Sequence, residues 1–350
     1  MSATASLAPN FLSPNQRAWA RFKRNHIGYR SFWIFLVLLL VASAAELVST
    51  DRPLVARING EWHFPIFNNP SERALGGDFA TPTDWKDPFI TELIAKSGSG
   101  NWALHTLIPH SADSTDYFAK VAHPAAPTAQ NWLGTDDKGR DMLARLLYGF
   151  RVSIWFALAL TFTGTLLGIL MGAIQGYFGG RIDLGLQRLI EIWGAIPELY
   201  LLIIFASIFE PSLLLLLVLL SLWGWMGLSD YVRAEFLRNR SLEYVKAARA
   251  LGLSNAQIIR RHVLPNSLTP VITFLPFRMS AAILALTSLD FLGLGVPASM
   301  PSLGELLKQG KTNLDAWWII VPTFLLLTIT MLLLTFIGDA LRDAFDTRKS

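Results

Sequence analysis

The chain has 350 residues, 52% of them hydrophobic, and a mean hydropathy of +0.39. The apolar residues fall in long blocks, which indicates a membrane protein rather than a soluble domain. The net charge of +4 is too small to indicate a nucleic-acid-binding protein. The sequence contains no cysteine, which excludes disulfides and thiol chemistry.

The N-terminal segment 1–30 is basic and contains no acidic residue, which predicts a cytoplasmic tail. The apolar run Phe32–Val48 then predicts a first transmembrane helix over residues 31–50. Ala42-Ser43-Ala44 resembles a signal-peptide cleavage site. The apolar run is longer than a typical signal-peptide core, so we expect an uncleaved membrane span.

Residues 51–147 are polar, rich in proline and tryptophan, and carry more acids than bases. Cytoplasmic loops are enriched in Lys and Arg, so this segment is predicted to be periplasmic. It is too long for a plain loop, so we expect a small extracytoplasmic subdomain.

Five further apolar runs approach or exceed the length of about 20 residues that crosses a bilayer. They lie near 151–176, 187–209, 212–229, 267–291 and 316–338. The sequence therefore predicts an all-α integral membrane protein with six transmembrane helices, a periplasmic insert after the first helix and a cytoplasmic coupling-helix loop. The core is predicted over 148–340, with the loop at 230–266 and a C-terminal tail at 341–350. An even number of spans places both termini in the cytoplasm, beside the arginine-rich loop.

Two features of the predicted spans concern helix packing. Gly164, Gly168, Gly172 and Gly176 recur every four residues and form one small-residue face. Such a face lets membrane helices approach closely, and packing within the chain is favoured over contact with a partner subunit. Pro197, Pro276 and Pro322 also lie in spans, where they predict kinks that suit a moving gate or merely a curved helix.

The cytoplasmic segment 243–265 has the pattern of two short helices. Ala247, Ala248 and Ala250 would allow close docking, and Gly252 suits a break because it tolerates positive φ. Ser254 with Gln257 three residues later predicts an N-cap and capping box for the second helix. Pro265 is expected to end that helix and redirect the chain.

This segment resembles the cytoplasmic coupling motif of ATP-binding-cassette (ABC) importer permeases, written Glu-Ala-Ala, three residues, Gly, then Ile-x-Leu-Pro. Lys246 and His262 depart from the motif at its first acid and at its isoleucine. The resemblance implies that an ATPase docks on this loop. The implied coupling residues are Tyr244, Ala247, Ala248, Arg249, Gly252, Leu264 and Pro265.

Other blocks are similar to the dipeptide and oligopeptide branch of these permeases, namely Leu133–Asp141, Phe291–Gly295, Pro301–Gly304 and Gly338–Asp346. The insert is similar to that of Yej-type permeases, which belong to importers of oligopeptides and of the peptide antibiotic microcin C. The resemblance implies an inner-membrane permease that translocates peptides by alternating access. The implied partners are a second, homologous permease in a heterodimer, ABC ATPase subunits, a periplasmic peptide-binding protein and membrane lipid.

The charged block before the second span predicts a site at the periplasmic mouth, with Gly134, Asp136, Gly139, Arg140 and Asp141. These residues could hold the loop over the pore or touch the incoming binding protein. The alternative is a solvated turn, since Asp137-Lys138-Gly139 has turn chemistry.

We expect no catalytic residue, metal or cofactor in this chain, with ATP and Mg²⁺ bound by the partner ATPase. The stretch from Gly304 to Thr312 resembles a phosphate-binding loop but has one residue too many between its glycines. Two alternative functions stay open. One is a stand-alone secondary transporter of peptides or small solutes, and the other is a membrane enzyme whose insert binds substrate.

Overall fold

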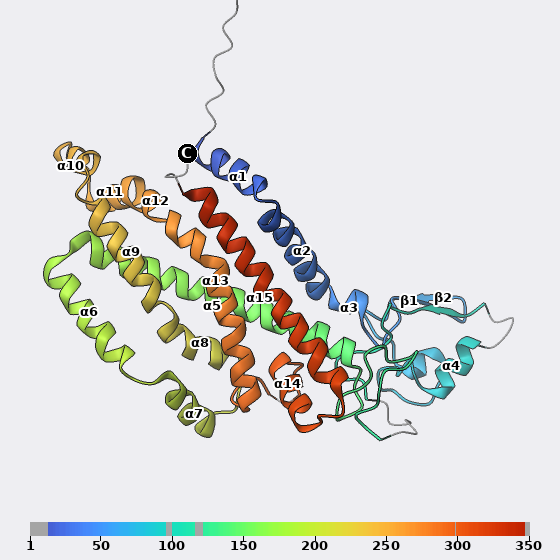
Figure 1. The fold of residues 1–350 in the computed structure, drawn as a ribbon. Helices are drawn as coiled ribbons and strands as arrows, with labels where there is room; N and C mark the ends of the chain where they lie inside the picture. The colour runs from blue at the N-terminus through green and yellow to red at the C-terminus, as the bar shows by residue number, and fades with distance from the viewer. Residues whose placement is uncertain (1–12, 96–99, 116–121, 298, 347–350) are drawn as a thin grey trace, which may run out of the picture.

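The computed structural model describes residues 13–95, 100–115, 122–297 and 299–346, and the outermost parts of both predicted tails lie outside these ranges. Within them, five helical segments are long and apolar enough to cross a membrane (Figure 1). They are α2 (His26–Ser43), α5 (Met142–Phe178), α8 with α9 (Leu213–Gly224 and Met226–Asn239), α13 (Thr269–Leu292) and α15 (Trp317–Phe345). A sixth span exists if the bent pair α6 (Gly180–Gly194) and α7 (Glu198–Ile208) counts as one. The six-helix count therefore stays a prediction.

The predicted third span is two helices joined at an angle of 63°. Pro197 stands at the N-cap of α7, where it ends the helical hydrogen-bond ladder because it has no backbone N–H. Pro276 and Pro322, in contrast, lie inside the unbroken helices α13 and α15. Only one of the three prolines thus coincides with a helix break.

The N-terminal segment is helical before the first span begins. Helix α1 (Pro14–Arg24) starts with a capping box made by Ser13 and Gln16. Its Phe22 is buried against Ala340 and Ala344 of α15. The first span, α2, begins after Asn25, whose side chain accepts a hydrogen bond from the backbone N–H of Gly28. Helix α2 then runs beside α15 (Figure 1).

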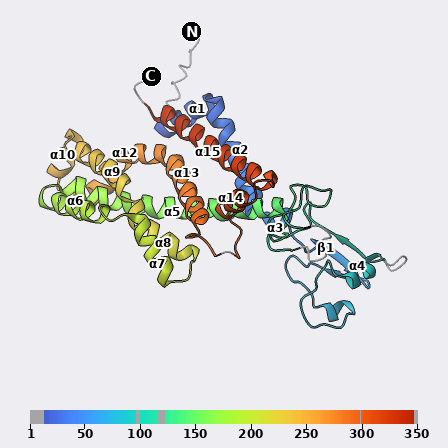
Figure 2. The same ribbon diagram turned by 60° about the horizontal axis from the view of Figure 1, so that its bottom comes forward.

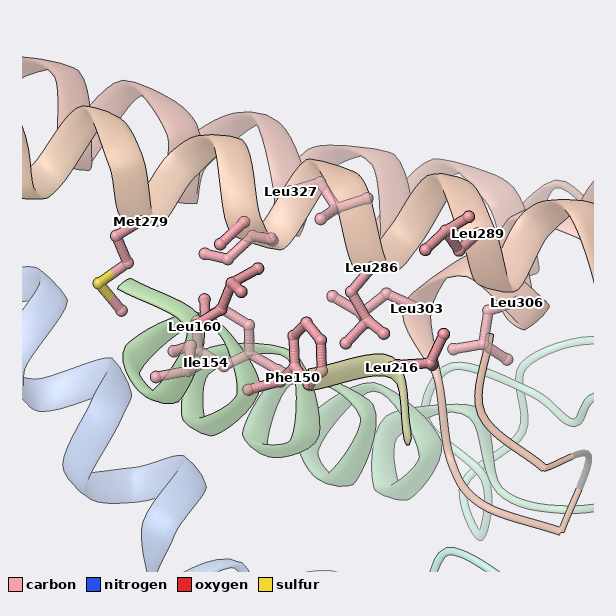
Figure 3. Packing of buried hydrophobic residues seen from close by; sticks show 14 of the residues in the cluster. Phe150, Ile154, Leu160, Leu216, Met279, Leu286, Leu289, Leu303, Leu306 and Leu327 are labelled. Atoms are coloured by element: carbon pink, nitrogen blue, oxygen red, sulfur yellow. The ribbon is translucent and has the colours of Figure 1, made fainter. Parts of the chain in front are cut away.

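The main apolar core lies where α5 meets α13, α15 and the short helix α14 (Leu303–Thr312). Figure 3 shows its side chains from several helices pointing toward one another. The labelled members are Phe150, Ile154, Leu160, Leu216, Met279, Leu286, Leu289, Leu303, Leu306 and Leu327. The stretch that resembles a phosphate-binding loop forms helix α14 itself, and the buried Leu303 and Leu306 of this helix pack in the core. Within a membrane such packing stabilises the bundle through van der Waals contacts between the helices, because lipid is as apolar as these side chains.

The insert, whose internal fold the sequence left open, contains a small sheet. Strands β1 (Val55–Ile58), β2 (Glu61–His63) and β3 (Trp102–Leu104) pair antiparallel in the order β2-β1-β3. The insert also contains the 3₁₀ helix Glu72–Leu75 and helix α4 (Pro88–Ala95). A separate core is formed by Ala56, Ile58, Leu75, Trp85 and Ile90. The insert therefore has an apolar core of its own.

The insert and the coupling loop lie at opposite ends of the helical body. The short helix α3 (Ala45–Val48) leads from α2 into the insert. Figure 2 shows β1 and α4 at one end and α10 (Glu243–Ala250) at the other. Helix α10 is followed by α11 (Asn255–Ile258), a π-helical turn (Ile259–Val263) and α12 (Leu264–Ser267).

Candidate coupling surface and buried charge cluster

Helix α10 has one face against the permease body and one face in solvent. Val245 and Ala248 are buried and belong to a core shared with α5 and α9. They share a face because residues three apart in a helix are neighbours. Tyr244, Ala247 and Arg249 are exposed. Ala248 therefore packs inside the chain, which corrects its expected place on the docking surface.

The break between α10 and α11 has the local geometry expected from the sequence. Gly252 has a φ of 81°, in the left-handed region that favours glycine. The Ser254 hydroxyl accepts a hydrogen bond from the backbone N–H of Gln257, and the Gln257 side chain accepts one from the N–H of Ser254. The predicted capping box is confirmed.

Pro265 does not end a helix, so that prediction is wrong. The chain stays helical through a π turn and continues in α12, where Pro265 occupies the first turn. A proline lacks the N–H that a regular helix would use there, and the π turn directly before α12 is the kind of local adjustment that accommodates it. Pro265 is exposed and Leu264 is half-buried.

The loop also presents an exposed apolar residue that the sequence analysis missed. Leu251 is 80% exposed at the end of α10, directly before Gly252. With Tyr244, 40% exposed, and Ala247, it forms the exposed tip of the loop. The Tyr244 hydroxyl accepts a hydrogen bond of 3.1 Å from the Asn266 amide. A leucine before a helix-ending glycine is the signal that could have indicated Leu251.

Tyr177, near the end of α5, ties the coupling loop to the longest helix. Its buried hydroxyl donates a 2.8 Å hydrogen bond to Asn255 Oδ1. Its backbone oxygen accepts a 3.0 Å bond from Arg240 Nη1, and the Arg249 guanidinium lies 5.9 Å from its ring centre. These contacts join residues distant in sequence, so no local pattern could have indicated them.

The four glycines of α5 lie against α8 and α9 of the same chain. A Cβ added at Gly168 would come 3.0 Å from the Trp225 oxygen, and one at Gly172 would come 2.5 Å from the Ser229 oxygen. At Gly176 it would come 2.5 Å from both the Arg233 oxygen and Phe236 Cβ, and at Gly164 it would meet Arg278 and Gly224. The small residues thus allow α9 to lie directly on the backbone of α5.

At the end of the helical body that carries the insert, a buried charge cluster is formed by Asp136, Arg140, Asp141 and Arg145. Asp136 Oδ2 lies 2.7 Å from Arg140 Nε and 3.9 Å from Arg145 Nε. Asp136 Oδ1 accepts bonds of 2.9 Å from the backbone N–H groups of Lys138 and Arg140. The side chains are too deeply buried to touch an incoming protein, so the cluster holds the loop.

The rest of the loop is fixed to α5 and α15. Asp141 is the N-cap of α5, and its other oxygen accepts a 2.9 Å bond from Asn131. Gly134 has a φ of 70°, and a Cβ there would meet Trp318 of α15. Gly139 has a φ of 76° and lies against the ring of His123. Asp137 and Lys138 alone match the solvated turn.

Comparison with known proteins identifies the family. Residues 164–350 match the model of the binding-protein-dependent transport system inner membrane component. Residues 13–62 match the N-terminal transmembrane domain of oligopeptide transport permease C. The chain is a permease of this transport family. Both the glycine stripe and the coupling loop lie within the larger match, whereas the charge cluster and most of the insert lie outside both.

Similar curated proteins are permeases of the same kind. The chain is 48% identical to the inner membrane ABC transporter permease protein YejE of Escherichia coli K12, over 97% of this chain and 99% of that one. It is 45% identical to the peptidoglycan transport system permease protein YejE of Agrobacterium fabrum, over 98% and 95%. The oligopeptide transport system permease protein OppC of Haemophilus influenzae is 36% identical, over 69% of this permease and 77% of the relative.

Proposed function

We propose that this permease conducts short peptides across the bacterial inner membrane, driven by ATP that partner subunits bind with Mg²⁺ and hydrolyse. The observation that carries the energy-coupling part is the exposed tip of the coupling loop, with Leu251 80% exposed. An exposed leucine beside small and aromatic residues is better accommodated in an apolar groove of a partner protein than in contact with water. The peptide part is supported by the names of relatives, which include oligopeptide, dipeptide and peptidoglycan transport systems.

The proposed assembly contains a homologous second permease, ATPase subunits below and a periplasmic peptide-binding protein above. Both termini and the coupling loop lie in the cytoplasm in this arrangement, and the insert lies in the periplasm. Microcin C-like peptides are among the proposed cargo. The pair α6–α7 leaves much apolar surface exposed, with Ile192, Tyr200 and Ile208 each about 70% exposed. Lipid and the second permease are the proposed cover for this surface.

Motion would pass from the ATPase through α10 into the membrane helices. The Tyr177 contacts make α5 move with the loop, and the glycine stripe makes α9 move with α5. Both helices therefore respond as one unit when ATP closes the ATPase pair. Alternating access requires such a bundle with two states whose balance the nucleotide changes.

The test uses Leu251→Ser, with Leu314→Ser as the matched control. Both leucines are about 80% exposed, and Leu314 lies in the loop between α14 and α15, at the proposed periplasmic side. Since neither side chain packs in the fold, both variants should insert normally. We expect Leu251→Ser to lose ATPase co-purification and peptide uptake in vesicles about tenfold, a change of about 1.4 kcal/mol. Leu314→Ser should retain the ATPase.

Equal ATPase recovery and uptake by both variants would contradict the proposed docking surface. Peptide uptake by this chain alone, without ATP or any ATPase, would instead favour the stand-alone transporter. The family match argues against that alternative. A wild-type complex that hydrolyses ATP but imports no peptide would refute the peptide assignment.

A further inference from the structure

A cavity of about 270 Å³ lies between α5, α7, α8 and α13. Its lining includes Thr161, Glu198, Trp223, Arg278 and Ala281. Thr161, Trp223 and Arg278 stand near the middle of their candidate spans, and Glu198 follows the bend between α6 and α7. The cavity therefore sits deep in the membrane region, where two chain breaks and two opposite charges meet.

The two charges need an explanation because a charge within the bilayer is costly. Glu198 and Arg278 line the same cavity, yet no ion pair between them occurs among the described residues. A structural pair would be expected to close into direct contact. Charges kept apart around a cavity instead indicate a polar pathway that excludes lipid.

The guanidinium group of Arg278 is held by one hydrogen bond and has further N–H groups that are not bonded within the described part of the chain. Arg278 Nη2 donates a 2.6 Å hydrogen bond to the backbone oxygen of Gly224, the last residue of α8. This carbonyl lies at the break before α9, so it is available as an acceptor. Arg278 Nε, Trp223 Nε1 and Thr161 Oγ1 are buried without a hydrogen-bond partner among the described residues. Unpaired buried donors are rare and costly, and they favour an acceptor-rich ligand.

We propose that this cavity is a substrate-contact site in the translocation pathway, where Arg278 binds the C-terminal carboxylate of the passing peptide. The inference rests on the proposed function. A guanidinium is the side chain best suited to hold a carboxylate through two parallel hydrogen bonds. Drug-sized ligands occupy about 300–1,000 Å³, so this smaller cavity receives one end of a peptide. Glu198 repels a carboxylate from the α7 wall and so directs it to Arg278.

The absence of cysteine allows a direct test. Ala281→Cys places one thiol in the cavity lining, and Leu325→Cys places one on an exposed position of α15 outside it. Both are assembled with the second permease, ATPase and binding protein, then treated with an anionic and a cationic methanethiosulfonate. We expect Ala281→Cys to react with both reagents and faster with the anion, and Leu325→Cys to react slowly with both.

Adding Arg278→Gln should lower the ratio of anionic to cationic rates about tenfold, a change of about 1.4 kcal/mol, because it removes the nearby positive charge. Arg278→Lys keeps the charge and should keep the ratio, which separates charge from misfolding. Glu198→Gln should raise the ratio. An unreactive Ala281→Cys, or a ratio that Arg278→Gln leaves unchanged, overturns the inference.

The ligand is tested with two peptides that the binding protein loads equally, one with a free C-terminal carboxylate and one amidated. During turnover, the free peptide should slow labelling of Ala281→Cys at least about tenfold more than the amidated one. In Arg278→Gln the two should be equal. Equal protection in the wild-type background, with uptake intact, overturns this inference alone. Failure of the wild-type complex to take up either peptide overturns the proposed function as well.

Discussion

At the scale of single residues, buried charges hold the loop that leads from the insert into α5. Asp136 is fully buried and accepts bonds from two backbone N–H groups as well as from Arg140. Arg145 is also fully buried and lies near the same carboxylate. Removing one member of such a network leaves the others charged and unpaired in a dry environment. The cluster therefore stabilises the folded loop, and its loss should destabilise the protein.

We expect Asp136→Asn to destabilise the protein by about 3–5 kcal/mol, because it removes the counter-charge of the buried Arg140 and leaves the buried Arg145 with Asp113 alone. Asp137→Asn is the matched control, since Asp137 is the adjacent aspartate and is exposed. Thermal unfolding in detergent measures both. Equal midpoints of thermal unfolding for the two variants would show that Asp136 contributes no more to stability than Asp137.

At the scale of helices, the glycine stripe decides how closely α5 and α9 approach. A methyl group at Gly176 would meet backbone and side-chain atoms of α9 at 2.5 Å. Gly185, on the exposed surface of α6, has no atom within 4 Å of the same position. The same substitution thus has opposite expected effects at two helical glycines.

Gly176→Ala should destabilise the bundle by about 1–3 kcal/mol through overpacking. Gly185→Ala should be neutral or stabilising by up to about 1 kcal/mol, because alanine favours a helix. Thermal unfolding and membrane yield compare the two variants. A stable Gly176→Ala beside a destabilised Gly185→Ala would contradict the close packing of α5 on α9.

Local features of the helices were predictable from the sequence, and distant contacts were not. The capping box at Ser254 and the positive φ of Gly252 follow from residues a few positions apart. The pairing of β3 with β1 joins segments far apart in the chain, through strands too short to leave an alternating pattern. The same holds for Tyr177 with Asn255 and for Arg145 with Asp136.

The candidate site shows the same division. The sequence placed the coupling loop by its charge and small residues, but helical phase turns Ala248 inward and leaves Leu251 outward. Two prolines in spans left their helices continuous, whereas Pro197 coincides with a sharp bend. Neighbouring helices can accommodate a proline, so the packing around it decides whether the helix bends there or stays continuous.

At the scale of the whole molecule, the bent pair α6–α7 determines the topology. If the pair crosses the membrane, Glu210 lies on the side opposite Ser241, and the coupling loop shares a side with both termini. If the pair returns to the side it entered from, each later loop changes side. The coupling loop would then share a side with the insert, which conflicts with its position at the other end of α5, where Tyr177 bonds to Asn255.

Single cysteines resolve this choice because the chain contains none of its own. Glu210→Cys, Ser241→Cys and Asn313→Cys each place a thiol near a helix end, where Glu210 and Ser241 are exposed and Asn313 is half-buried. In intact cells, a membrane-impermeant maleimide should label Glu210→Cys and Asn313→Cys but spare Ser241→Cys, which should react only after the membrane is opened. This pattern follows from six spans and a cytoplasmic coupling loop. Protection of Glu210→Cys together with labelling of Ser241→Cys in intact cells would establish the re-entrant pair and remove the proposed ATPase from this face.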